Sequence, residues 1–201
     1  KSFFVSGVSH QLRTPLTSIR MFTEILRVGS LHDEEHVREY LGIIDGEAAR
    51  LARLIDNVLD FSRIERGIKE YRRETLEPAL VARNAAAAMQ YQFRQEKACF
   101  TMDITPNLPA LEGDPDALQE AVMNLLDNAL KYSPAPKSVV LHVENDGAHI
   151  VYSVQDNGVG IEADKISLIF DPFYRARDPN TARSGGTGLG LALVAAIVHA
   201  H

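Results

Sequence analysis

Apolar residues recur at helical spacing through the first third of the chain. In the clearest stretch they are separated alternately by four and three residues, like the a and d positions of a heptad repeat: Val37, Leu41, Ile44, Ala48, Leu51, Ile55 and Val58. An earlier stretch, which begins with the first residues, also has a helical pattern, and Val28-Gly29-Ser30 breaks it. The pattern therefore predicts a helical hairpin over residues 1–66.

A two-helix hairpin is too narrow to enclose its own apolar stripe. Pairing with a second copy into a dimeric four-helix bundle is the economical way to bury that stripe. The alternative is a hairpin that packs against the rest of the same chain. We expect the dimer, because a sustained heptad pattern is typical of helices that pair along their whole length.

The pattern changes near Gly67, where a charged segment without heptad positions predicts a linker over residues 67–74. A second domain is expected over residues 75–201. Its predicted helices cover about Pro78 to Glu96, a stretch after Asp114 as N-cap with Pro115 at the first helical position, and Leu189 to His199.

Strands are predicted where apolar residues alternate with polar ones. One strand has its apolar positions at Ala98, Phe100, Met102 and Ile104. Two more flank the turn signal Asn145-Asp146-Gly147, with apolar positions at Val139, Leu141 and Val143 and at Ile150, Tyr152 and Val154. Helices interleaved with mostly antiparallel strands predict a two-layer α/β sandwich.

Composition narrows the possible functions. The 201 residues suffice for one large domain or two small ones with cores, and 45% hydrophobic with 24% charged residues is ordinary for a globular protein. A formal charge of −6 argues against nucleic acid as a partner. The single Cys99 excludes an intramolecular disulfide and a cysteine metal cage, and fits a reducing compartment.

The first candidate for chemistry is His10, within Ser9-His10-Gln11-Leu12-Arg13-Thr14-Pro15-Leu16. A lone helical histidine is more often structural, but neutral imidazole is a competent nucleophile towards phosphorus near neutral pH. Pro15 removes a backbone donor one turn after His10, which exposes carbonyl groups and permits bending. Thr14 lies at i+4 from His10, so both side chains share one helical face.

A second candidate is the stripe formed by Asn124, Asn128 and Lys131, at positions i, i+4 and i+7 of a predicted helix. Amide oxygens are hard ligands that suit Mg²⁺, and a lysine can offset phosphate charge. The alternative is an amphipathic helix with incidental amides. Helix interiors disfavour asparagine, so two of them one turn apart weaken that alternative.

Two glycine-containing loops complete the candidates. In Asp156-Asn157-Gly158-Val159-Gly160, the carboxylate can accept a hydrogen bond from an exocyclic amine such as that of adenine, although this pattern also occurs in ordinary tight turns. The run from Gly185 to Leu191 leads directly into a predicted helix, where backbone N–H groups can hold phosphate. Between the loops lies Phe170-Asp171-Pro172-Phe173-Tyr174-Arg175.

A weaker possibility is a metal site at His32-Asp33-Glu34-Glu35-His36, where two histidines stand at i and i+4. This segment falls in the predicted hairpin connection. Solvated charge is the default interpretation there.

Five of these motifs occur in a fixed order: the His10 motif, the asparagine stripe, the Asp156 loop, the segment from Phe170 to Arg175, and the glycine run. This order resembles that of bacterial two-component sensor histidine kinases. The resemblance covers nearly the whole chain. It implies a dimerisation and histidine phosphotransfer domain at residues 1–66. It implies an ATP-binding catalytic domain at residues 75–201, similar to those of gyrase-type topoisomerases, heat-shock chaperones and mismatch-repair ATPases.

The resemblance implies roles for individual residues. His10 would accept the γ-phosphoryl group, with Gln11 beside it and Thr14 positioning water when a phosphorylated partner is dephosphorylated. Asn128 with Asn124 would hold Mg²⁺, and Asp156 would read adenine. The remaining nucleotide contacts would come from Lys131, Tyr132, Gly158, Gly160, Phe173, Arg175, Gly186, Thr187, Gly188, Leu189 and Gly190. The implied partners are a second copy of the chain and the receiver domain of a response regulator.

Two features depart from the family pattern. The family usually has an acidic residue directly after the histidine, where this chain has Gln11, so a weakly active or phosphatase-dominated module is an alternative. A clamp-type ATPase without kinase activity is another, although it would not need His10. The family's catalytic domain normally continues with further β-strands after the helix that ends near His199. We expect the chain to be the cytoplasmic portion of a longer protein, anchored upstream in the bacterial inner membrane.

Overall fold

The computed structural model describes residues 2–28, 33–66, 68–175 and 188–201; inside the helices, the side chains of residues 2–8, 10, 11, 49, 50, 53 and 65 also lie outside this description. The chain divides into two compact units, Lys1–Gly67 and Ile68–His201. Each unit has its own architecture.

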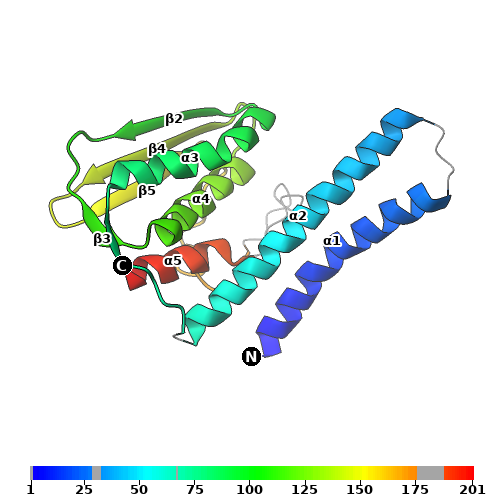
Figure 1. Ribbon diagram of the computed structural model, residues 1–201, viewed down its shortest axis with the longest axis horizontal. Helices are drawn as coiled ribbons and strands as arrows, with labels where there is room; N and C mark the ends of the chain where they lie inside the picture. Colours follow the sequence, from blue (N-terminus) through cyan, green and yellow to red (C-terminus); the bar gives the residue numbers. More distant parts are fainter. Residues whose placement is uncertain (1, 29–32, 67, 176–187) are drawn as a thin grey trace. The chain divides into compact units, whose positions relative to one another are not determined.

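The first unit is a hairpin of two long helices, α1 (Ser2–Val28) and α2 (Glu34–Glu65) (Figure 1). The predicted helical hairpin is therefore confirmed. The two helices pack on each other, and the rings of Phe22 and Tyr40 lie 5.0 Å apart. Asp33 caps α2 by accepting a hydrogen bond from Glu35 N at 2.9 Å. Pro15 lies inside α1 without ending it.

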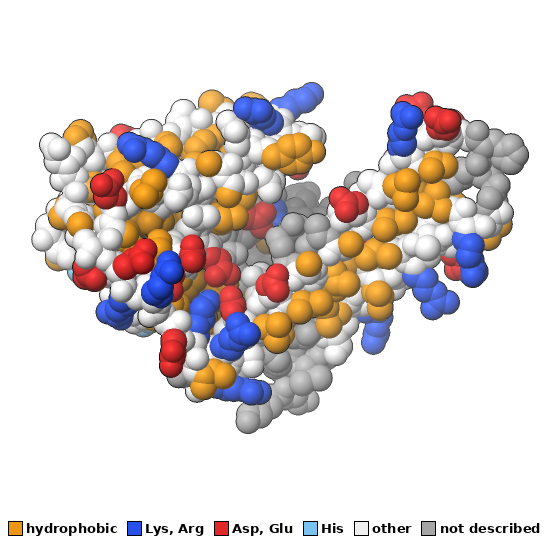
Figure 2. All heavy atoms as spheres, in the orientation of Figure 1, with side chains coloured by type: hydrophobic (Ala, Val, Ile, Leu, Met, Phe, Trp, Pro, Cys, Tyr) orange, Lys and Arg blue, Asp and Glu red, His pale blue; other side chains and the backbone are white. Residues whose placement is uncertain are grey.

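The predicted apolar positions of α2 fall into two sets in the single chain. The half-buried positions are Val37, Ile44, Leu51 and Val58. The exposed positions are Leu41, Ala48 and Ile55. Figure 2 shows hydrophobic side chains gathered along the hairpin. The hairpin alone therefore leaves much of its apolar stripe uncovered.

The second unit contains two small sheets and three helices. Its elements are β1 (Glu74–Leu76), α3 (Pro78–Gln95), β2 (Cys99–Ile104), β3 (Leu111–Gly113), α4 (Pro115–Tyr132), β4 (Ser138–Asn145), β5 (Ile150–Asp156) and α5 (Gly190–Ala200). The main sheet has the order β2-β4-β5, with β2 parallel and β5 antiparallel to the central β4. Strands β1 and β3 form a separate antiparallel pair.

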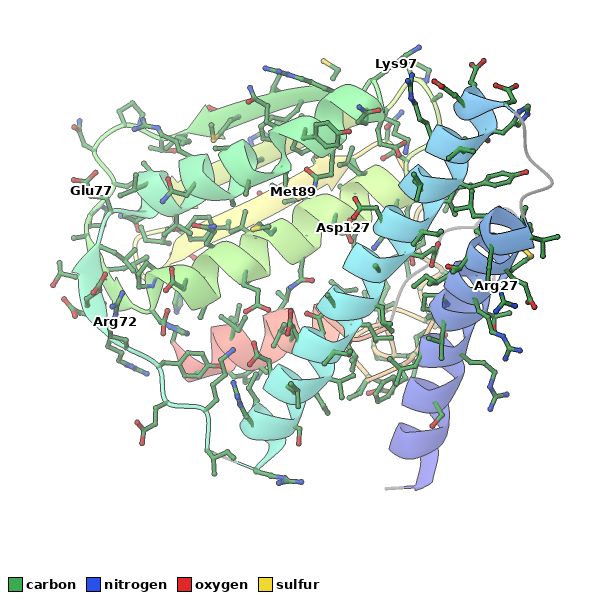
Figure 3. All side chains as sticks on the ribbon, turned by 45° about the vertical axis from the view of Figure 1, so that its right-hand side comes forward. Arg27, Arg72, Glu77, Met89, Lys97 and Asp127 are labelled. Carbon is green, nitrogen blue, oxygen red and sulfur yellow. The ribbon has the colours of Figure 1, made fainter. Side chains whose placement is uncertain are left out.

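Helices α3 and α4 cover one face of the main sheet, which gives the predicted two-layer arrangement (Figure 1). The alternating residues Val139, Leu141 and Val143 are at most 1% exposed and point into the core between the layers. Met89, labelled on α3 in Figure 3, belongs to the same core. Helix α5 packs on α4. The strand expected around Phe100 and the hairpin around Asn145-Asp146-Gly147 are both present.

Candidate functional site

The candidate site is built around α4, which has one buried and one half-buried face. Val122, Leu126, Ala129 and Leu130 are buried in the core. Asn124, Asn128 and Lys131 are half-buried on the opposite stripe, as the spacing predicts. Burial of the apolar face fixes the helix rotation, so the polar stripe has a defined direction.

The two asparagines of this stripe differ in what their amides already contact. Asn124 Nδ2 donates to Glu120 O at 3.1 Å, and a Cβ on Gly190 would lie 3.1 Å from Asn124 Oδ1. The amide of Asn124 therefore lies against the first turn of α5. The amide of Asn128 makes no side-chain hydrogen bond to the described residues.

The C-terminal end of α4 carries charge. Lys131 forms an ion pair with Asp127, one turn earlier and labelled in Figure 3. This carboxylate holds the ammonium group on the polar stripe, beside Asn128. In the part of the chain that the structure describes, no group of three or more histidine, cysteine or carboxylate side chains could hold a metal ion.

The Asp156 turn packs on the end of α4. Asp156 is the last residue of β5, and its Oδ1 accepts a hydrogen bond from Gly158 N at 2.7 Å. A Cβ on Gly158 would lie 2.5 Å from that same oxygen and 2.9 Å from Tyr132 O, so only glycine fits without a shift. Gly160 has φ +75°, a conformation that favours glycine. The turn that follows Asp156 thus packs on the Tyr132 backbone through Gly158.

The glycine run meets the segment that contains Phe173. Phe173 N donates to Gly188 O at 2.7 Å, and both residues have left-handed backbones, with φ +66° and +70°. A Cβ on Gly188 would lie 2.8 Å from Phe173 Cα. Leu189 is fully buried, and Gly190 is the first residue of α5. The chain therefore returns to α4 in a fixed position at the start of α5.

The Asp156 turn and the glycine run thus both meet α4, and the glycine run also meets the Phe173 segment. Tyr132 contacts Gly158, Asn124 lies against Gly190, and Gly188 is bonded to Phe173. Arg175 is half-buried in the same unit. Gly186 and Thr187 lie outside the described residues.

The motif around His10 belongs to the other unit. His10 and Gln11 lie within α1, but their side chains are outside the description, and Thr14 is exposed on the same helix. For the possible metal pair in the hairpin connection, His32 lies outside the described residues. His36 Nδ1 lies 2.9 Å from Asp33 Oδ2, next to the α2 cap.

Sequence reasoning missed one polar residue of the site. Asn157 Oδ1 accepts from Ser138 N, and its Nδ2 donates to Pro136 O, both at 2.9 Å. The signal was present in the sequence, since Asn157 directly follows Asp156. Its partners, however, lie 19 and 21 residues earlier, and only the pairing of β4 with β5 brings them close.

None of the helices that the structure describes combines the length and the apolarity needed to span a bilayer.

Comparisons with known proteins agree with the division of the chain into two units. The His Kinase A (phospho-acceptor) domain family matches residues 1–67. The Histidine kinase-, DNA gyrase B-, and HSP90-like ATPase family matches residues 113–201. The chain is 34% identical over 200 residues to the sensor protein kinase WalK of Staphylococcus aureus, which covers 98% of this chain and 48% of that protein. It spans about half or a third of the length of the curated relatives it matches.

Solved structures give the same result. The structure is similar to the Acinetobacter baumannii histidine kinase AdeS, with a TM-score of 0.71 and 25% identity over 95% of this chain and 86% of that one. It also has the fold of histidine kinase ThkA in complex with response regulator protein TrrA, with a TM-score of 0.67 and 22% identity over 85% of this chain and 50% of that one. The chain therefore belongs to the sensor histidine kinases, as a core that joins a phospho-acceptor hairpin to a histidine kinase-, gyrase- and HSP90-like ATPase domain.

Proposed function

We propose that this core transfers the γ-phosphoryl group of ATP to His10 and then to an aspartate of a response-regulator receiver domain. The observation that carries the proposal is that the Asp156 turn and the glycine run both meet α4, the helix of the asparagine stripe. The Asp156 turn packs on Tyr132, and the start of α5 lies against Asn124. A nucleotide bound along α4 would meet all three motifs at once.

Adenine recognition is assigned to Asp156. Its Oδ1 is held by Gly158 N, which leaves Oδ2 to accept the exocyclic amine. Gly158 and Gly160 allow the backbone to pass close to the base, because neither carries a side chain. Tyr132, whose carbonyl touches this turn, would line the same region.

The phosphates are assigned to the other end of the site. Gly188, Leu189 and Gly190 lead into the N-terminus of α5, and the N–H groups at a helix N-terminus attract anions. The first turn of α5 contains no acidic residue to compete for them. Lys131 and Arg175 would add positive charge, and Gly186 and Thr187 belong to the same proposed loop.

Asn128 fits a role in holding Mg²⁺ with the nucleotide, because its amide oxygen is a hard ligand that no other described group engages. Asn124 is the second ligand in the proposal. When bound, Mg²⁺ would neutralise phosphate charge that develops during transfer.

The acceptor chemistry is assigned to the His10 motif. An imidazole nitrogen of His10 forms the new bond to the γ-phosphorus, while the bond from that phosphorus to the ADP oxygen breaks. Gln11 would hold the ring by a hydrogen bond, and Thr14 would orient water during dephosphorylation of the regulator. The complex of ThkA with TrrA supports a response regulator as the next acceptor.

A homodimer is part of the proposal. Leu16, Leu41, Ile55 and Leu59 are each at least 44% exposed on the hairpin of a single chain. Residues of this size along two long helices are typical of a surface that a second copy covers. Because ATP and receiver domains are cytoplasmic, we also place this core on the cytoplasmic side of a membrane-anchored kinase.

Incubation with ATP labelled at the γ-phosphate tests the function. Wild-type protein should acquire a label that is stable in alkali and lost in acid, as expected for phosphate on a histidine nitrogen. A clamp-type ATPase would release inorganic phosphate and leave the protein unlabelled. The match to the phospho-acceptor family over residues 1–67 does not favour that alternative.

A further inference from the structure

The side chain of Asn157 joins the turn that carries Asp156 to the first residue of β4 and to the segment just before it. Asn157 Oδ1 accepts a hydrogen bond from Ser138 N at 2.9 Å, and Asn157 Nδ2 donates one to Pro136 O at 2.9 Å. One amide therefore satisfies a backbone donor and a backbone acceptor two residues apart.

These two bonds extend the sheet beyond its last paired residues. The ladder of β4 and β5 ends where Val139 pairs with Asp156. The bond between Ser138 N and Asn157 Oδ1 lies just beyond that pair, on the neighbouring residue of each strand. It therefore continues the attachment of this end of β5 to β4 and restrains the position of Asp156.

The other side of the turn is restrained by packing. Gly158 lies so close to α4 that a Cβ there would be 2.9 Å from Tyr132 O. Gly158 N also holds Asp156 Oδ1 at 2.7 Å. The turn that carries the Asp156 carboxylate is therefore held in three ways: by the pairing of β5 with β4, by the packing of Gly158 on α4, and by the hydrogen bond from Ser138 N at the start of β4 to Asn157.

We propose that Asn157 is a positioning residue for adenine recognition, which keeps the Asp156 carboxylate aligned with the exocyclic amine of the base. The proposal rests on the proposed function, in which Asp156 reads that amine. Asn157 itself is assigned no contact with the nucleotide, because both polar atoms of its side chain are already engaged by backbone. Its effect should therefore appear only in the part of the affinity that depends on the amine.

The test compares ATP with purine riboside triphosphate, which lacks only the exocyclic amine. Binding of each to the whole chain is measured by calorimetry for wild type, Asp156→Ala, Asn157→Ala and the double variant. We expect Asn157→Ala to weaken ATP binding by about three- to tenfold, the range for losing about one neutral hydrogen bond, and to leave the amine-free analogue unchanged. The double variant should bind ATP no more weakly than Asp156→Ala.

Asn145→Ala is the matched control. Asn145 is also an exposed asparagine that accepts a backbone N–H, from Gly147 at 2.9 Å, but at the opposite end of the same two strands. It should leave both affinities unchanged. Asn157→Asp keeps the acceptor for Ser138 N and removes the donor to Pro136 O, so it provides the test if Asn157→Ala does not fold.

The results distinguish a wrong assignment of Asp156 to adenine from a wrong positioning role for Asn157. If Asp156→Ala leaves the preference for ATP over the analogue unchanged, the assignment of Asp156 to adenine is wrong. If Asp156→Ala removes that preference but folded Asn157 variants retain it, or lose affinity for both nucleotides equally, the positioning role of Asn157 is wrong.

Discussion

At the scale of single residues, Gly188 and Gly147 share a backbone conformation and differ in their surroundings. Both have left-handed φ angles, +70° and +98°. A Cβ on Gly188 would lie 2.8 Å from the Phe173 backbone, whereas a Cβ on Gly147 would meet nothing within 4 Å. Alanine therefore adds the same kind of backbone strain at both positions and a steric clash at only one.

We predict that Gly188→Ala weakens ATP binding by at least about tenfold, because separating Gly188 from Phe173 displaces the start of α5. Gly147→Ala should cost about 1–2 kcal/mol of stability from the left-handed backbone alone and leave ATP affinity unchanged. Titration of both folded variants with ATP measures the difference. Equal affinities in the two variants would mean that the Gly188–Phe173 contact has no part in nucleotide binding.

Gln11 sets the expected rate of phosphorylation. When imidazole attacks phosphorus, its remaining N–H becomes acidic, and a neighbouring carboxylate can take that proton. A glutamine carbonyl accepts the hydrogen bond but is too weak a base to take the proton. General-base assistance is typically worth about 10²–10⁴-fold in rate, so the wild-type reaction should be present but slow.

We therefore predict that Gln11→Glu raises the autophosphorylation rate by at least about tenfold, with little change in ATP affinity. Single-turnover labelling with saturating ATP gives the rate, and nucleotide titration gives the affinity. An unchanged or slower rate in a variant that binds ATP normally would mean that this kinase uses another base or none.

At the scale of elements, Asp114 fixes the start of α4 and the segment before β1 together. Its side chain accepts hydrogen bonds from Asp116 N and Ala117 N at 3.1 Å, which cap α4. It also accepts one from Arg72 N at 2.9 Å. Burial alone would raise the pKa of this carboxyl group, but the N–H groups of Ala117, Arg72 and Asp116 together hold the pKa below its ordinary value.

We predict that Asp114→Ala lowers the free energy of unfolding by about 1 kcal/mol at pH 7, as for other N-cap losses. Asp114→Asn should cost less, because asparagine caps equally well. The folded pKa lies below the unfolded value of 3.8, so the wild-type carboxylate contributes stability above that pH and loses it as the pH falls further. The free energy of unfolding of wild type, relative to that of Asp114→Asn, should therefore decrease as the pH falls. Denaturant unfolding between pH 7 and 3 measures this difference, and a difference that stays constant over the range would contradict the prediction.

The helices and the longer strands could be predicted because their causes are local. Asp114 with Pro115, and the turn signal after Asn145, act within a few residues. Strands β1 and β3 were not predicted, since each has three residues and exists only by pairing Glu74 with Gly113 and its neighbours. The parallel pairing of β2 with β4 also depends on a crossover through α4, which the alternation of apolar residues does not encode.

The same distinction applies to the candidate site. The motifs at Asn128, Asp156 and Gly188 were recognisable because residue types and spacing carry the chemistry. The contacts that join them were not, because Asn124 with Gly190, and Asn157 with Ser138, are neighbours only in the folded unit. Positive φ at Phe173 had no signal in the sequence, since phenylalanine rarely adopts that conformation.

At the scale of the whole molecule, the proposed dimer can be tested with two leucines that are equally exposed in a single chain. Leu41 on α2 is 52% exposed, and so is Leu80 on α3 of the second unit. Only Leu41 belongs to a heptad series. The two leucines are equally exposed in a single chain, but in the proposed dimer only Leu41 would be buried by the second copy.

We predict that Leu41→Lys shifts the whole chain from dimer to monomer in sedimentation at micromolar concentration, because a lysine would be buried in the apolar seam. Leu80→Lys, equally exposed in the single chain, should leave the dimer intact. A wild-type protein that sediments as a folded monomer at tens of micromolar, where an interface of ordinary size should hold, would overturn the dimer.

The central claim is that ATP bound in the second unit phosphorylates His10 in the first. The most direct measurement is mass spectrometry of peptides from ATP-treated protein, digested and separated without acid so that a phosphorus–nitrogen bond survives. We predict one phosphorylated peptide containing His10, which is absent in His10→Ala and strongly reduced in Asp156→Asn at a limiting ATP concentration, the latter because its affinity for ATP is lower. Phosphate on another residue, or an unlabelled His10 in protein that binds and hydrolyses ATP, would contradict the account.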